Sequence, residues 1–574
     1  MTDLARAEAA PVPEPAIPGQ RRGPDYLPWI AGALTLFVLV AFMVYPILKT
    51  LANSFAPAGE VISFANATFA NFERFWTSRL YQNALRNTLI IGVVVTILST
   101  LVALPMAYFV ARVDMRFKPL ILSLSIIPLI SPPFIGAYAW VILFGRSGIF
   151  THYLGEWFGI SVPPIYGYNG VILAMVLSNF TYVFLFVQGA LAAVDPHLEE
   201  SAKVMGASRA RVLRTVVLPL AIPPMLAGAM IVMIEALGEF GVPAILGGEM
   251  YVLSTLMYFQ IHGFFNLNGA AAIALVNVAI TLVAILLLIR FNKKRRFITV
   301  GSTTRRAAQH TGRGIKIIAY VYVWGLLAFA LLPQAVILFT SFAERWPGTL
   351  WPTQYGWGNY QYVFSRVMQP LQNSLLLATV ATIACVIFGT LTGYVAERKK
   401  FAGKWALDLT IMLPFILPGI VTGVALLVTY NSGPVVLTGT AIILVIGYFV
   451  RRIAYIYRSV VAAVGQVDPK MEEASAVAGA TWGYTMRKVT VPLIAPGILA
   501  GAIIVFTTLI SEMSTTVMLY SAQWKTISIA IYERLESQEI QAAAAIGAIT
   551  IVVTLILVFS ATKVIGKSMS ELFR

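Results

Sequence analysis

The chain has few of the residues that build disulfides, metal centres or charged surfaces. A single cysteine, Cys385, stands among 574 residues, so no disulfide can form within the chain. The four histidines occur singly and form no cluster of metal ligands. Only 11% of the residues are charged. These shortages exclude a disulfide framework and a histidine- or cysteine-based metal centre.

Hydrophobic residues, in contrast, are abundant. It makes up 58% of the chain, and the mean hydropathy is +0.80. No soluble fold hides that much apolar surface, which indicates a polytopic protein of the lipid bilayer. The net charge of +16 is compatible with nucleic-acid binding. However, the basic residues lie in short loops between apolar runs, so we expect no nucleic-acid partner.

Twelve apolar runs are each long enough to cross a hydrocarbon core of about 30 Å. They lie near 26–48, 84–110, 119–143, 169–193, 216–238, 270–290, 315–341, 374–396, 405–429, 437–462, 490–510 and 542–562. The first run resembles a signal peptide, but it is too long and starts too far into the chain, so we expect a retained helix. Residues 1–27 lack apolar periodicity and predict a disordered cytoplasmic tail.

The runs form two similar halves of six, residues 28–297 and 315–574, joined by a linker at 298–314. Near the middle of each half, matching residues recur at one offset of 273 positions, as in Asp195 and Asp468. Earlier in each half the offset is 286, as in Arg112 and Arg398, so the first half holds 13 extra residues, around 147–168. An even number of helices per half predicts a parallel repeat about an axis along the membrane normal.

The distribution of lysine and arginine predicts the orientation. With the amino terminus inside, the inner segments hold 29 of the 41 basic residues and the outer segments hold 9. The other three, Arg451, Arg452 and Arg458, fall within the tenth run. Both chain ends are therefore expected in the cytoplasm.

Each half contains a polar island, residues 195–229 and 468–502, which the charge count also places in the cytoplasm. High helix propensity on both sides of Gly206 and Gly479 predicts two short helices joined at a glycine turn. Small residues would allow a partner to approach closely, and the glutamates would offer it charged contacts. Pro219 and Pro492 suit the first turn of the following membrane helix.

The islands resemble the E-A-A-x3-G-x9-I-x-L-P loop of binding-protein-dependent ABC transporter permeases. The first copy has Glu200-Ser201-Ala202, Gly206 and Val216-Val217-Leu218-Pro219 at these spacings. The second has Glu473-Ala474-Ser475, Gly479 and Val489-Thr490-Val491-Pro492. The departures are conservative and leave the spacing unchanged. In that family the loop couples the permease to its ATPase. The coupling residues implied here are Glu199, Glu200, Ala202, Gly206, Pro219, Glu472, Glu473, Ala474, Gly479 and Pro492.

The resemblance implies an all-α permease of the type I ABC importer class in the bacterial inner membrane. A periplasmic solute-binding protein would deliver the solute. A separate cytoplasmic ATPase dimer would carry ATP and magnesium, so no cofactor and no enzymatic activity are expected in this chain. The segment 561–568 superficially fits a P-loop, but a membrane helix precedes it where a strand is required. The fused form particularly resembles ferric-iron import permeases, and thiamine, polyamine and aminoethylphosphonate permeases remain alternatives.

Polar residues within or beside the apolar runs are candidates for the translocation path. They are Glu235, Glu239, Glu512, Arg451 and Arg452, with no metal site expected. Glu239 and Glu512 share the offset of 273, which predicts a facing acidic pair at the outer mouth. The bland alternative is a pair of interfacial acids at helix ends. Prolines at 128, 132, 133, 414 and 418 are expected to break the third and ninth helices.

Two other classes of protein remain as rivals. A secondary transporter with a parallel repeat needs membrane-embedded ion sites and has no use for paired docking islands. A membrane-embedded enzyme is less favoured, because the sequence shows no nucleophile–base pair and no set of metal ligands.

Overall fold

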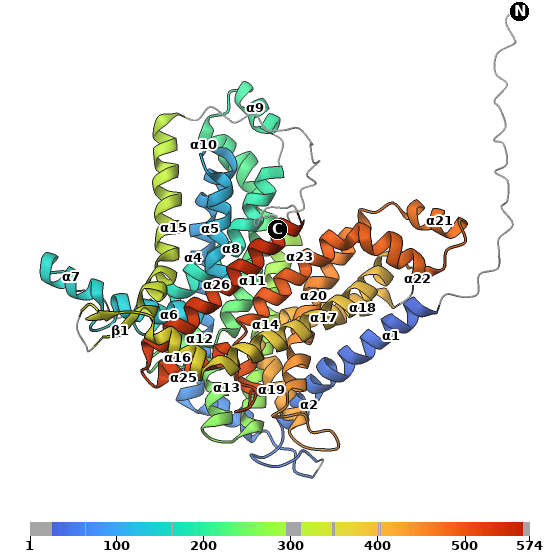
Figure 1. The fold of residues 1–574 in the computed structure, drawn as a ribbon, viewed down its shortest axis with the longest axis horizontal. Coiled ribbons are helices and arrows are strands. Elements are labelled where there is room, and N and C mark those ends of the chain that lie inside the picture. The colour runs from blue at the N-terminus through green and yellow to red at the C-terminus, as the bar shows by residue number, and fades with distance from the viewer. Residues whose placement is uncertain are drawn as a thin grey trace, which may run out of the picture.

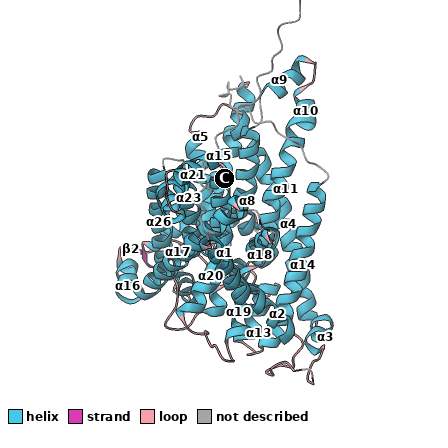
Figure 2. Ribbon diagram, turned by 90° about the vertical axis from the view of Figure 1, so that its right-hand side faces the viewer, coloured by secondary structure: helices cyan, strands magenta, loops and turns pink. Residues whose placement is uncertain are grey.

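The computed structural model describes residues 26–565 except 64, 162, 164, 194–195, 294–311, 347–349, 400 and 402. Within these residues the chain is almost wholly helical (Figure 2). Two short antiparallel strands occur there, β1 (Ala343–Arg345) and β2 (Gln354–Tyr355). The predicted all-α class is confirmed. Residues 1–25 of the predicted tail and most of the predicted linker lie outside the described residues.

The first half runs from α1 to α14 (Figure 1). Its main helices are α1 (Leu27–Leu39), α2 (Tyr45–Asn53), α3 (Ala70–Thr77), α4 (Arg79–Arg112), α5 (Lys118–Ile130), α6 (Pro133–Phe144), α7 (Ile149–Phe158), α8 (Tyr168–Ala193), α9 (Pro196–Val204), α10 (Arg209–Val212), α11 (Leu218–Gly238), α12 (Gly241–Leu246), α13 (Leu253–His262) and α14 (Leu267–Lys293).

The second half repeats this order. Its helices are α15 (Arg313–Ser341), α16 (Gly358–Arg366), α17 (Met368–Arg398), α18 (Lys404–Ile416), α19 (Gly419–Tyr430), α20 (Ala441–Gly465), α21 (Pro469–Val477), α22 (Trp482–Thr485), α23 (Val491–Ile510), α24 (Thr516–Leu519), α25 (Ile527–Glu536) and α26 (Ile540–Ile565).

The prediction of twelve continuous spans needs correction at three places. Ten helices in the described part are long and apolar enough to cross a membrane, and one bent pair, α18 with α19, makes an eleventh. The predicted third span, 119–143, is split between α5 and α6. The predicted tenth span is α20, a helix of 25 residues that carries three arginines. Each half therefore contains six apolar regions, as predicted, but not every region is one straight helix.

Proline causes both breaks, at Pro132 and Pro418. The expectation is wrong for Pro128 and Pro414, which lie inside α5 and α18 without ending them. A residue that precedes proline is driven out of the helical region. Ser131, before Pro132, has φ −67° and ψ 136°, and Leu417, before Pro418, has φ −81° and ψ 131°. Both are extended, so each helix ends there, and α19 leaves α18 at an angle of 106°.

The two halves exchange their first helices. In the first half, α1 and α2 pack against α17 and α19 of the second half. Thr392 donates to the Thr35 hydroxyl at 3.0 Å, and Tyr430 donates to the Ala41 carbonyl at 2.9 Å. In the second half, α15 packs against α4, α5 and α6 of the first, where the Tyr322 hydroxyl donates to the Val102 carbonyl at 2.8 Å. The halves are therefore separate in sequence but interlocked in space.

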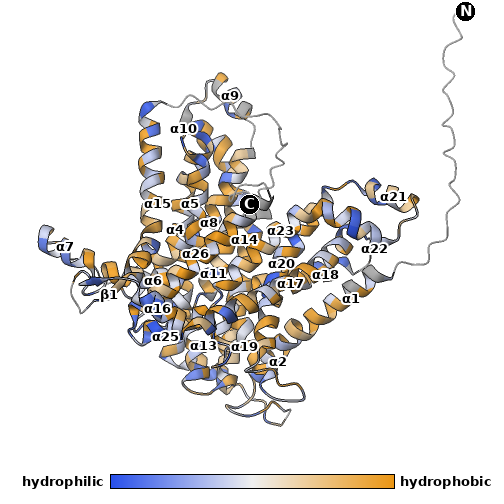
Figure 3. Ribbon diagram, viewed as in Figure 1, coloured by the Kyte–Doolittle hydropathy of each residue, from blue (hydrophilic) through white to orange (hydrophobic). Residues whose placement is uncertain are grey.

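Polar sequence gathers at the two ends of the helix bundle, and apolar sequence fills the length between them (Figure 3). The helices α9 and α21 of the two islands lie at the same end (Figure 1). Helices α13 and α16 lie toward the other end. Apolar side chains remain exposed along the outer helices, as at Ile318 and Val321 of α15. Such surfaces are expected to face lipid.

Candidate functional site

Each island folds as two short helices around a glycine, as predicted. The first consists of α9 and α10 with Gly206 between them, and the second consists of α21 and α22 with Gly479 between them. Gly206 has φ +83° and Gly479 has φ +85°. This left-handed conformation is costly for any residue with a Cβ atom, which explains why glycine occupies both turns.

The paired glutamates of each island have different environments. Glu199 is only 3% exposed, and its Oε1 lies 2.6 Å from Nε of Arg112 at the end of α4. Its counterpart Glu472 lies 3.2 Å from Nε of Arg398 and accepts a bond of 3.0 Å from the Tyr394 hydroxyl. The expectation that these glutamates offer their charge to a partner is therefore corrected, because both are used inside the chain.

Other island residues remain free to meet a partner. Glu473 and Ala474 are exposed, whereas Ala202 is half-buried. The side chain of Glu200 lies outside the described part. Apolar side chains also project from the islands: Val204 is 88% exposed, Met205 84% and Val477 73%. Exposed apolar groups beside charged ones, repeated in both halves, are typical of a protein-docking surface.

The second helix of each island continues into a membrane helix through a π turn. These turns are η2 (Leu213–Val217) and η3 (Met486–Thr490). Pro219 and Pro492 follow directly, in the first turns of α11 and α23 as predicted. However, the membrane helix does not start afresh there, since Ala210–Gly238 and Trp482–Ile510 are each continuous. A π turn changes the hydrogen-bond register at the point where proline lacks its N–H.

A polar cluster lies among the apolar helices, where α11 approaches the break between α18 and α19. We call it the central cluster and define it as Glu235, Glu239, Arg451, Arg452 and Glu512. The packing is close, because a Cβ atom on Gly238 of α11 would lie 2.7 Å from Pro418. All the residues predicted for the translocation path are therefore brought together.

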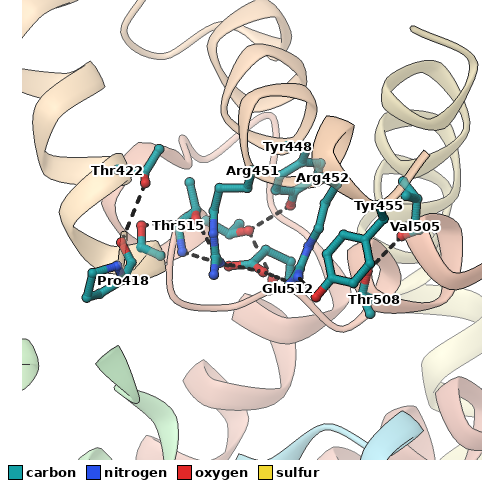
Figure 4. A network of polar contacts seen from close by, with 12 residues as sticks. Pro418, Thr422, Tyr448, Arg451, Arg452, Tyr455, Val505, Thr508, Glu512 and Thr515 are labelled. Atoms are coloured by element: carbon teal, nitrogen blue, oxygen red, sulfur yellow. Dashed lines mark hydrogen bonds and ion pairs between the residues drawn. The ribbon is translucent and has the colours of Figure 1, made fainter. Parts of the chain in front are cut away.

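Glu512 is the most fully paired member of the cluster (Figure 4). Its carboxylate accepts two bonds from Nη1 of Arg451, at 2.9 and 3.0 Å, and one from Nη2 of Arg452 at 3.0 Å. The Thr515 amide donates a further bond of 2.9 Å. The residue is 6% exposed, so the charges are removed from water and compensate one another.

Glu239 has no such cation, although it occupies the equivalent position. Its Oε1 accepts bonds from the backbone amides of Gly241, at 2.9 Å, and Val242, at 3.2 Å, and so caps α12. Glu235, one turn earlier, makes no hydrogen bond and no ion pair within the described part of the chain. Glu239 and Glu512 are close enough to interact, as predicted for a facing pair, but their surroundings differ. Glu512 is buried and Glu239 is half-buried, and the two differ in their partners.

The cluster also links the two halves electrostatically. Arg452 interacts with Glu235 and Tyr182 of the first half as well as with Glu512 of its own. Tyr182 and Tyr455 are themselves 273 positions apart and interact with each other. A cavity of about 50 Å³ adjoins the cluster in the first half. It is lined by Pro128, Leu129, Pro133, Met175, Ser178, Asn179, Tyr182, Glu235, Glu239 and Val242.

The 13 extra residues of the first half form a projecting segment that includes α7 (Figure 1). Trp157 and Phe158 at its end are 69% and 68% exposed. The Tyr153 hydroxyl accepts a bond of 2.9 Å from the Trp351 indole, which ties α7 to the second half. Tyr168, in contrast, donates to Asn87 within the fold. The aromatic residues of this segment therefore divide into an exposed group and a structural group.

Four residues that contribute to these sites were not predicted from the sequence. Arg112 and Arg398 aligned between the halves, but their role in anchoring the islands was not predicted. Tyr182 and Tyr455 also align, and that coincidence within membrane helices was the signal that could have identified them.

Comparison with known proteins identifies the relatives of the chain. The family described as binding-protein-dependent transport system inner membrane component matches residues 96–297 and 385–571, one copy in each half. The ferric transport system permease protein FbpB of Actinobacillus pleuropneumoniae is 29% identical over 553 residues, covering 94% of this chain and 78% of that protein. The putative ferric transport system permease protein FbpB 1 of Haemophilus influenzae is 30% identical over 515 residues, covering 87% and 79%.

A shorter relative matches a smaller part of the chain. The molybdenum transport system permease protein ModB of Escherichia coli is 30% identical over 212 residues, which is 35% of this chain and 92% of that protein.

Proposed function

Because this chain belongs to the binding-protein-dependent transport system inner membrane components and is the permease of an ABC importer, we propose that it carries ferric iron into the cytoplasm. A periplasmic binding protein delivers the metal to the outer end of the bundle. A separate ATPase dimer, which holds ATP and magnesium, drives alternating access from the inner end. The chain itself contributes the pathway and no hydrolytic chemistry.

The observation that carries the coupling part of this proposal is the pair of glycine-turn islands at one end of the bundle. Two equivalent docking sites suit a dimer of ATPase subunits. The exposed side chains Val204, Met205, Glu473 and Val477 offer apolar and charged contacts to such a partner. Glu199 and Glu472 hold each island against its membrane helix, so that a movement of the island is passed to the bundle.

The orientation follows from the charge distribution. With the islands in the cytoplasm, both chain ends lie there too, and the protein is a multi-pass component of the bacterial inner membrane. The exposed Trp157 and Phe158 then project on the periplasmic side, where they suit an interface with the binding protein.

The translocation path passes the central cluster, where the two halves meet. Its three carboxyl groups outnumber its two guanidinium groups, a composition that suits a cation better than an oxyanion. This balance counts against the phosphonate-bearing aminoethylphosphonate, and the names of two long relatives, which specify ferric transport, support iron. Thiamine carries a thiazolium cation, so the charge balance does not separate it from iron. Polyamines are also cationic, and they are separated from iron only by experiment.

The substrate is tested by uptake into vesicles that contain the chain, its ATPase and its binding protein. Radioactive ferric iron is the probe, and excess thiamine, putrescine and 2-aminoethylphosphonate are the competitors. We expect ATP-dependent uptake of iron that none of the three competitors reduces. Uptake of one competitor with no uptake of iron would overturn the substrate assignment while leaving the importer class intact.

A further inference from the structure

Carboxylates at equivalent positions of the two halves have different neighbours, which are cationic in the second half and neutral in the first. Glu512 and Glu239 are 273 positions apart, and both accept bonds from backbone amides that follow them. The arginines that neutralise Glu512 also have counterparts at this offset. Arg451 corresponds to Ser178 and Arg452 corresponds to Asn179. The second half therefore carries two built-in cations where the first half carries two small neutral side chains.

The first half contains space where the second half contains guanidinium groups. Its cavity of about 50 Å³ is lined by both Ser178 and Asn179, the counterparts of the arginines. The same cavity is lined by Glu239 and by Glu235, whose own counterpart is the neutral Thr508. The first half has smaller residues where the second half has two arginines, so it contains a hollow. An additional acid, Glu235, lines this hollow.

We propose that this cavity is a binding site for the metal cation in transit, with Glu235 and Glu239 as its charged ligands. This proposal rests on the proposed function and adds to it the place of the substrate. The cation occupies the position that arginine fills permanently in the second half. The permease therefore has one transit site rather than a symmetrical pair.

The state of the carboxylates supports a cation there. Backbone amides hold Oε1 of Glu239 in place, while its Oε2 makes no bond within the described structure. Glu235 also makes no hydrogen bond or ion pair there. Both glutamates are half-buried, and a carboxylate partly withdrawn from water without a counter-ion is destabilised. Two neighbouring ones that are incompletely paired attract a positive ion strongly.

The remaining donors are also oxygen atoms. Asn179 donates its amide N–H to the Met175 carbonyl at 2.9 Å, which leaves its own side-chain oxygen available. The Ser178 and Tyr182 hydroxyl groups also line the cavity, and its other walls are the apolar residues Pro128, Leu129, Pro133, Met175 and Val242. Carboxylate, carbonyl and hydroxyl oxygens suit hard metal ions rather than soft ones.

The site has few metal ligands, which favours passage of an ion over its retention. Among the described residues, no three histidine, cysteine, aspartate or glutamate side chains group as metal ligands. A bound ion would thus keep part of its water shell, and the cavity has room for a water molecule beside it. Weak, incomplete coordination allows an ion to leave again, which a transport pathway requires.

The test measures binding of Tb³⁺, an oxygen-preferring trivalent probe, to the purified complex of the full chain with its ATPase. Tyrosine-sensitised luminescence reports binding, and ferric iron uptake is measured in parallel. One variant is Glu235→Gln with Glu239→Gln, which keeps side-chain size and removes both charges. The other is Ser178→Arg with Asn179→Arg, which reproduces the arrangement of the second half. Glu73→Gln with Glu249→Gln removes two exposed carboxylates and is the matched control.

We expect about one Tb³⁺ per wild-type chain, a loss of affinity of at least tenfold in both site variants, and no change in the control. Iron uptake should fall in the same two variants. Unchanged Tb³⁺ affinity in both site variants would overturn the site, even if the wild type still imports iron. If the wild type binds Tb³⁺ at this site but imports no iron, the site stands as a cation site and the ferric assignment fails instead.

Discussion

Nε of Arg112 lies 2.6 Å from Oε1 of Glu199, joining the end of a membrane helix to the first helix of an island. The second half repeats the pair as Arg398 and Glu472 at 3.2 Å. Both pairs are at least half-buried, and they are the only polar anchors of this kind that recur at equivalent positions in the two islands of the described structure. They give the islands a rigid attachment through which motion can pass.

Breaking this anchor should reduce stability and coupling together. Glu199→Gln leaves the guanidinium of Arg112 buried without its counter-ion, which costs about 3 kcal/mol. We expect a lower thermal unfolding temperature of the purified chain and weaker ATP-driven uptake. Glu473→Gln, at an exposed position, is the control. It should leave the unfolding temperature unchanged and weaken only the association with the ATPase. Equal unfolding temperatures for the two variants would contradict the division of roles.

The glycine turns should respond to backbone strain rather than to crowding. A Cβ atom added to Gly206 or Gly479 would meet no other atom within 4 Å, so space is not limiting. The positive φ angle alone should cost about 1–2 kcal/mol for most residues. We therefore expect uptake to fall from glycine to asparagine to alanine to valine at position 479. Asparagine is the informative control, because it tolerates the left-handed region better than alanine does. An order that followed side-chain size, with asparagine worse than alanine, would refute the strain argument.

Glu512 and Glu239, two of the three acids of the central cluster, should differ in what they stabilise. Glu512→Gln leaves Arg451 and Arg452 without their carboxylate, so we expect a loss of about 3–5 kcal/mol and poor recovery of the folded chain. Glu239→Gln removes a charge that has no cationic partner at hydrogen-bond distance, so stability should be preserved. The measurement is thermal unfolding of each variant in detergent. A larger loss for Glu239→Gln than for Glu512→Gln would contradict the arrangement described here.

The projecting segment should matter only when the binding protein is present. Replacing Trp157 and Phe158 by serine removes exposed aromatic surface and leaves the bond between Tyr153 and Trp351 in place. We expect the stimulation of ATP hydrolysis by the binding protein to fall severalfold, while basal hydrolysis is unchanged. Phe117→Ser, at an exposed position before α5, serves as the control. A parallel loss of basal and stimulated hydrolysis would indicate a structural role for α7.

Much of the architecture could be predicted because its causes are local or repeated. Glycine at the island turns and proline at the helix breaks act through their own backbone, so sequence alone located them. The parallel repeat was visible because polar residues recur at a fixed offset in an otherwise apolar chain.

The errors have non-local causes. The burial of Glu199 depends on Arg112, which is 87 positions earlier in the chain and becomes a neighbour only through packing. Likewise, Glu239 and Glu512 look equivalent in sequence, and their difference arises from side chains on α8 and α20. The exchange of first helices between the halves left no local signal, since apolar helices face lipid or protein with the same residues.

ATP hydrolysis by a docked partner should drive import through this chain. The most direct measurement is ferric iron uptake into liposomes that contain the full chain, with the ATPase, the binding protein and ion gradients supplied or omitted one at a time. We expect uptake that requires ATP, the ATPase and the binding protein, and that persists when proton and sodium gradients are collapsed. Uptake by the chain without its ATPase, abolished when those gradients are collapsed, would instead identify a secondary transporter.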